Sequence, residues 1–69
     1  MSAYYVNKNA QANGDHEVHK EGCSYVPQAW NAEYLGEFTT CYGAVTEARR
    51  RGYLMADGCA HCCPLCHSS

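Results

Sequence analysis

The sequence is poor in the residues that build a hydrophobic core. It contains no isoleucine, and its large aliphatic residues and phenylalanine together number eight in 69 positions: Val6, Val18, Val26, Leu35, Phe38, Val45, Leu54 and Leu65. This share is well below the roughly 20% under which a chain orders itself with difficulty. A domain of this length is also only marginally stable when it depends on apolar burial alone. We therefore expect a second source of stability, either disulfides or a bound metal ion.

Targeting signals and an excess of one charge are also missing. Residues 1–12 have neither the basic start nor the apolar stretch of a signal peptide. No segment approaches the roughly 18 apolar residues of a membrane span. We therefore expect a cytoplasmic chain with no membrane partner, in which the thiols stay reduced. The net charge of −2 creates no general attraction for nucleic acid.

Cysteine, by contrast, is abundant, with six residues in this short chain. A disulfide framework and a metal site both produce such a density. Reduced cysteines close to histidines favour a metal ion, and structural disulfides are the alternative.

The residue pattern predicts one domain over residues 1–69. β-branched and aromatic residues favour strands at 4–6, 16–19 and 34–39. Residues 1–15 are expected to form a partly flexible N-terminal strand and loop. Shorter features are an extended segment at 24–26, which Pro27 ends, and a loop or single helical turn at 28–33.

Residues 41–51 show the clearest helical pattern, and no strand is expected in the stretch 53–57 that follows. Thr39 or Thr40 is a suitable N-cap, and Gly52 is a suitable end. The apolar face of this helix contains Ala44, Val45 and Ala48. The expected fold is a small zinc-stabilised α+β module, with a short antiparallel sheet, one helix and a Cys-rich C-terminal turn.

The C-terminal segment contains two Cys-x-x-Cys pairs, Cys59–Cys62 and Cys63–Cys66. Such a turn can bring two thiolates to one ion, at about 2.3 Å from each sulfur. The segment 19–23 contains a histidine and a cysteine around a tight turn, and it can supply the other two ligands. We predict one structural zinc ion, which can contribute about 10 kcal/mol or more to folding. Its predicted ligands are His19, Cys23, Cys59 and Cys62.

The remaining cysteines have several interpretations. Cys63 and Cys66 are small buried residues, substitutes for a predicted ligand, or parts of a redox or second metal site. Cys41, at the start of the predicted helix, is a core residue near the metal or a substitute ligand. Further nitrogen ligands are available at His16, at His67 and at His61, whose side chain should point outward.

A longer pattern runs through residues 19–62. It consists of His19-x-x-x-Cys23, Phe38-Thr39-Thr40, Ala44 and Ala48, Gly52-Tyr53, and Cys59-x-x-Cys62. This order resembles the small metal-binding domain of the bacterial adaptive-response DNA repair methyltransferase and related modules appended to some nucleases. The whole chain resembles short stand-alone bacterial proteins with no assigned function. The repair domain uses four cysteines, one of which accepts a methyl group from DNA phosphate. Here His19 holds the first position, so the resemblance does not transfer that reactive thiolate or its role on DNA.

These features favour a binding or adaptor module with an unidentified protein partner, and not an enzyme. The chain contains no Ser-His-Asp set, no paired-carboxylate pocket and no phosphate loop, and it is too small for a substantial cleft. A nucleic-acid-binding module is one alternative, with Arg49–Arg51 and the aromatic residues as its surface. A solvated helix end and an aromatic core explain the same residues more simply. A thiol redox or metal-handling protein that uses Cys63 and Cys66 is the other alternative.

Overall fold

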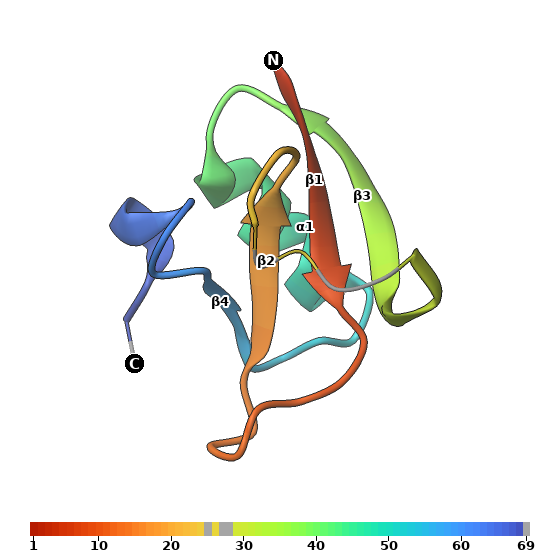
Figure 1. Ribbon diagram of the computed structural model, residues 1–69. Helices are drawn as coiled ribbons and strands as arrows, with labels where there is room; N and C mark the ends of the chain where they lie inside the picture. The colour runs from red at the N-terminus through yellow and green to blue at the C-terminus, as the bar shows by residue number, and fades with distance from the viewer. Residues whose placement is uncertain (25, 27–28, 69) are drawn as a thin grey trace.

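The computed structural model describes residues 1–24, 26 and 29–68. The described residues form one four-stranded sheet, one α-helix and two short 3-10 helices at Ala29–Asn31 and Pro64–Cys66. The strands are β1 (Ser2–Asn7), β2 (His16–Lys20), β3 (Ala32–Phe38) and β4 (Ala56–Gly58), and the helix is α1 (Cys41–Arg50). Helix α1 lies across one face of the sheet (Figure 1). This architecture confirms the predicted α+β class. No described helix is both long and apolar enough to cross a membrane.

The sheet has the strand order β3-β1-β2-β4. Strand β1 pairs antiparallel with both β2 and β3. A register shift between Tyr4 and Tyr5 lies opposite Gly36, whose φ of +122° suits glycine far better than any other residue. The predicted strands at 4–6, 16–19 and 34–39 are therefore confirmed. The first is longer at both ends and the second by one residue, whereas the third begins two residues earlier and ends one residue earlier than predicted.

Strand β4 was missed by the sequence analysis, which expected no strand in residues 53–57. It pairs parallel with β2, so that His16 lies beside Ala56 and Val18 beside Gly58. Three residues are too few to show a period of two, and β4 forms because β2 offers it a free edge. The sheet is thus antiparallel in two of its pairings and parallel in the third.

Helix α1 begins and ends close to the predicted positions. Thr40 holds the N-cap position with an extended backbone, but its side chain makes no capping hydrogen bond. Gly52 follows the helix with a φ of +104°, and the N–H of Tyr53 donates to Ala48 O at 3.1 Å. A left-handed residue just after the helix is the usual place for glycine.

The predicted extended segment 24–26 is described only at its ends, because Tyr25 lies outside the described residues, as do Pro27 and Gln28. Residues 29–31 form a 3-10 helix, and β3 begins immediately afterwards at Ala32. Loop and helical turn were both expected for the segment 28–33; its described residues, 29–33, are partly a helical turn and partly a strand.

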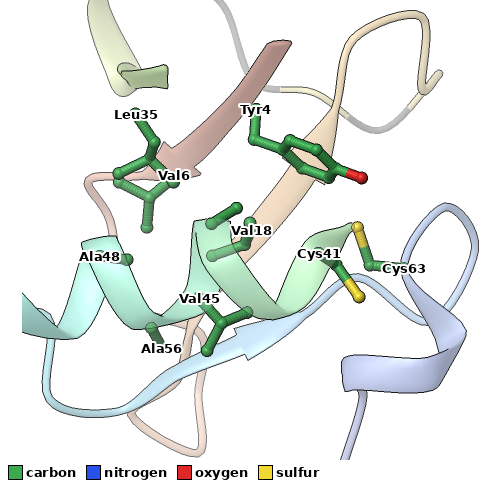
Figure 2. Packing of buried hydrophobic residues seen from close by; sticks show 10 residues of the cluster. Tyr4, Val6, Val18, Leu35, Cys41, Val45, Ala48, Ala56 and Cys63 are labelled. Carbon is green, nitrogen blue, oxygen red and sulfur yellow. The ribbon is translucent and has the colours of Figure 1, made fainter. Parts of the chain in front are cut away.

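The core lies between α1 and the sheet. Strand residues point toward α1, whose inner face contains Ala44, Val45 and Ala48 as predicted (Figure 2). The buried apolar residues of the described strands are Tyr4, Val6, Val18, Leu35 and Ala56. The expectation that the aromatic residues form the core is wrong for Trp30, Tyr34 and Tyr42, which are more than half exposed. Leu54 and Leu65 are exposed as well, so the apolar core is even smaller than the sequence suggests.

One disulfide joins Cys41 at the start of α1 to Cys66 in the second 3-10 helix. The expectation that all thiols stay reduced is therefore wrong for this pair. The interpretation of Cys41 as a buried core residue holds, but neither Cys41 nor Cys66 is available as a substitute ligand in this state. The free cysteines among the described residues are Cys23, Cys59, Cys62 and Cys63.

Candidate metal centre

His19 and Cys23 lie at the end of β2 and in the turn that follows it. The His19 side chain is almost completely buried, with 1% of its surface exposed. The turn closes when the N–H of Cys23 donates to Lys20 O at 3.2 Å. It contains Gly22 with a φ of +85°, a conformation that glycine adopts at little cost. The chain thus reverses direction and presents both side chains to the same region.

Cys59 and Cys62 come directly after β4. The N–H of Cys59 donates to Val18 O at 2.9 Å, which extends the pairing of β4 with β2. The N–H of Cys63 then donates to Cys59 O at 2.8 Å and closes the Cys-rich turn. Because β2 and β4 are parallel, their final residues meet at the same end of the sheet. The parallel pairing therefore brings the two ligand segments together.

The four predicted ligands converge on one point. The candidate ligand atoms of His19, Cys23, Cys59 and Cys62 all lie within 4.8 Å of one another. The sulfur of Cys23 is 3.8 Å from His19 Nδ1 and 4.0 Å from Cys59 Sγ. In a tetrahedral site with zinc–sulfur bonds of about 2.3 Å, two sulfurs are separated by about 3.8 Å. The spacing therefore fits a tetrahedral zinc ion with little rearrangement.

Backbone amides support the two cysteines of the C-terminal segment. The N–H of Lys20 donates to Cys62 Sγ at 3.2 Å, and the N–H of His61 donates to Cys59 Sγ at 3.4 Å. Hydrogen bonds to a ligand sulfur stabilise the thiolate, which is the form that binds metal. The Lys20 contact also ties the end of β2 to the Cys-rich turn.

The two ring nitrogens of His19 have different surroundings. Nδ1 faces the sulfur of Cys23, whereas Nε2 lies 3.5 Å from a carboxylate oxygen of Glu17. Nε2 is buried and makes no hydrogen bond within the described residues. Metal-binding histidines usually direct their second nitrogen at a carboxylate, which sets the tautomer. Glu17 is thus placed to hold the His19 proton on Nε2 and to leave Nδ1 free as a ligand.

Burial controls the protonation of this centre. It lowers the pKa of His19, an effect that Glu17 opposes, so the imidazole is neutral as a ligand must be. Burial also raises the pKa values of Cys62 and Cys63. Both are therefore thiols in the metal-free protein, and a cation must displace the proton from each cysteine that binds it.

The other candidates have other contacts. His67 Nδ1 lies 3.0 Å from Gly58 O and 3.2 Å from Asp57 Oδ2. His16 Nδ1 lies 2.9 Å from Asn7 O, and its ring lies against that of Tyr53. His61 is exposed, as predicted. Across the described ranges, the only group of three or more possible ligands with this spacing is the predicted set.

Sequence reasoning did not place two further residues, Glu17 and Cys63, beside the predicted ligands. Glu17 is two positions before His19 in a strand, and this spacing places both on the same face. That signal could have identified Glu17 as the partner of His19. Cys63 was considered and directly follows Cys62 in the sequence. The separation of 3.8 Å between their sulfurs, however, follows only from the fold of the turn.

Comparison of the chain with protein-family models, with characterised proteins and with solved structures gave no match. The interpretation of the centre therefore depends on its own geometry and chemistry.

Proposed function

We propose that this chain is a small zinc-stabilised binding module, in which one ion joins the turn after β2 to the turn after β4. The convergence of four candidate ligand atoms within 4.8 Å is the observation that supports this function. The ion would connect segments that are 36 residues apart at Cys23 and Cys59. In a domain with so few buried aliphatic residues, such a link supplies stability that apolar packing does not.

The ligand types favour zinc and a structural role. Three thiols and one imidazole are soft to intermediate donors, which suit zinc better than calcium or magnesium. Four protein ligands complete a tetrahedron and leave no position for water or substrate, as in structural zinc sites. We therefore assign no catalytic step to the chain, and its proposed partner is another protein.

A nucleic-acid-binding role, which the resemblance to the repair domain implies, has less support. The arginines at the end of α1 are engaged in intramolecular contacts. Arg50 and Arg51 donate to Glu47 at 2.7–2.9 Å, and Arg49 donates to Ala56 O at 3.2 Å. Arg51 also donates to Glu33 at 2.9 Å. These contacts compete with the phosphate contacts that such a role needs.

Metal analysis tests the proposed function. Purified protein should contain one zinc ion per chain, and cobalt(II) should replace it with the absorption of a tetrahedral site that has three thiolates and one imidazole. A strong chelator should remove the ion and unfold the protein, which circular dichroism would detect. A chain that folds equally well without metal and binds no zinc would overturn the proposal. Salt-dependent binding to duplex or single-stranded DNA would instead favour the nucleic-acid alternative.

A further inference from the structure

The disulfide between Cys41 and Cys66 supplies no ligand to the proposed zinc site. It joins the first residue of α1 to the last residue of the second 3-10 helix. The two halves differ in exposure, because Cys41 is buried at 8% exposed whereas Cys66 is partly exposed. In thiol–disulfide exchange, an incoming thiolate attacks a sulfur that it can reach. Cys66 is therefore the half of this disulfide that is open to attack.

A hollow of about 270 Å³ leads to Cys66, and its wall includes Arg49 but not Cys41. This volume is near the lower end for small-molecule pockets, about 300 Å³, and suits a small thiol better than a protein segment. No carboxylate side chain of the described residues lines the hollow. His67, also on the wall, lies 3.2 Å from Asp57, so Arg49 supplies the positive charge. The hollow thus favours a small thiol that carries a negative charge.

The other half of the disulfide lies where a departing thiolate is stabilised. Cys41 is the first residue of α1 (Figure 2), and the side chain of Thr40 makes no capping hydrogen bond there. The N–H groups of the first helical turn have no partner within the helix. These groups and the helix dipole stabilise a thiolate, and a stabilised thiolate leaves faster. Attack at Cys66 with departure of Cys41 is therefore the direction that the fold supports.

We propose that Cys41–Cys66 is an exchangeable disulfide, at which a small anionic thiol forms a mixed disulfide with Cys66. In the first step, the thiolate sulfur bonds to Cys66 Sγ while the Cys41–Cys66 bond breaks, and its electron pair leaves on Cys41. A second thiol then attacks the mixed disulfide and releases Cys66. In total, two small thiols are oxidised to one disulfide and the protein disulfide is reduced. The two thiol protons end on Cys41 and Cys66.

This reaction goes beyond the proposed zinc site and does not use its ligands. The protein disulfide is the oxidant and the small thiol is the reductant, so no further reactant is needed. Because the reaction is reversible, the disulfide form of the same thiol restores Cys41–Cys66. The state of this bond then follows the ratio of reduced to oxidised small thiol around the protein.

Incubation of the native protein with reduced glutathione tests this proposal. Alkylation stops the reaction, and cleavage after Arg49–Arg51 separates Cys41 from Cys66 for mass spectrometry. The disulfide should open under native conditions at a rate proportional to the glutathione concentration, with the first attachment on Cys66. A rate that is limited by unfolding, and therefore independent of the thiol concentration, would make the disulfide purely structural and overturn the proposal. First attachment on Cys41 would overturn it equally.

A neutral thiol, β-mercaptoethanol, tests the selectivity. At equal thiolate concentration and low salt, glutathione should react several-fold faster than β-mercaptoethanol, and high salt should reduce the difference. Arg49→Gln should lower the ratio of the two rates, whereas Arg49→Lys should retain it. Arg50→Gln is the matched control, because Arg50 does not line the hollow, and it should leave the ratio unchanged. Equal rates for both thiols in the native protein would overturn the assignment of an anionic substrate. Zinc content, measured in the same samples, reports on the proposed function and not on this exchange.

Discussion

Replacement of Gly58 by alanine should damage both the stability of the fold and the metal centre. Gly58 is the last residue of β4 and directly precedes Cys59. A Cβ atom at this position would lie 2.6 Å from Cys63 O and 2.6 Å from Cys66 Cβ. Non-bonded carbon atoms prefer about 3.5–4.0 Å, so the contact with Cys66 Cβ is about 1 Å too short, and the contact with Cys63 O is also closer than non-bonded atoms allow. The Cys-rich turn would therefore have to move.

The turn has little freedom to move. One of the clashing residues, Cys66, is tied to Cys41 by the disulfide, and two of the clashing atoms belong to the backbone. Overpacking of this kind typically costs about 1–3 kcal/mol. In a domain of this size, each kcal/mol lowers the melting temperature by about 4–8 °C, so we expect a decrease of about 4–24 °C. The affinity for zinc should fall by about 10-fold or more, because Cys59 and Cys62 lie in the displaced turn.

Gly43→Ala is the matched control. A Cβ at Gly43 would lie 2.8 Å from a ring atom of Phe38, so this variant also crowds a neighbour, but the atoms that it meets do not belong to the Cys-rich turn. Alanine also favours the interior of α1 by about 0.5–1 kcal/mol relative to glycine. Thermal melts and zinc titrations of both variants provide the comparison. If Gly58→Ala melts at the native temperature and binds zinc normally, the crowding at this position does not constrain the metal centre.

Three further predictions follow from the same contacts. As the pH falls from about 7 to 5, the urea midpoint should fall, because the pKa of His19 is lower in the folded chain and the unfolded chain binds more protons below about 6.5; a constant midpoint would contradict this. Cysteines 41 and 66 are 25 residues apart, so reduction of the Cys41–Cys66 disulfide should lower the free energy of unfolding, measured in urea, by about 3.5 kcal/mol. Zinc should stay bound, and its loss would show that the disulfide holds the centre together. Arg51→Ala should lower the melting temperature more than Arg50→Ala, because Arg51 joins α1 to backbone oxygens of β3, whereas Arg50 pairs with the carboxylate of Glu47 on its own helix; equal effects would argue against that role.

Several features of this protein could be predicted from local sequence alone. The helix that contains Val45 and the strand that contains Val18 were predicted from patterns among neighbouring residues, and both elements are present. The four candidate ligands could also be chosen in advance. The histidine and three cysteines form two closely spaced pairs, and a short turn brings the members of each pair together. Such spacing is typical of zinc ligands, so the sequence alone indicates the kind of site.

The tertiary structure alone decided which distant segments became neighbours. β4 exists because β2 has a free edge, and this parallel pairing sets the pairs His19–Cys23 and Cys59–Cys62 side by side. The fold also placed Cys66 next to Cys41 and left Cys63 as a free thiol beside the metal centre. Spacing along the chain does not determine such choices, because cysteines of equal chemistry can be combined in several ways. Only the packing of the sheet against α1 determines which cysteines form the disulfide and which lie at the metal centre.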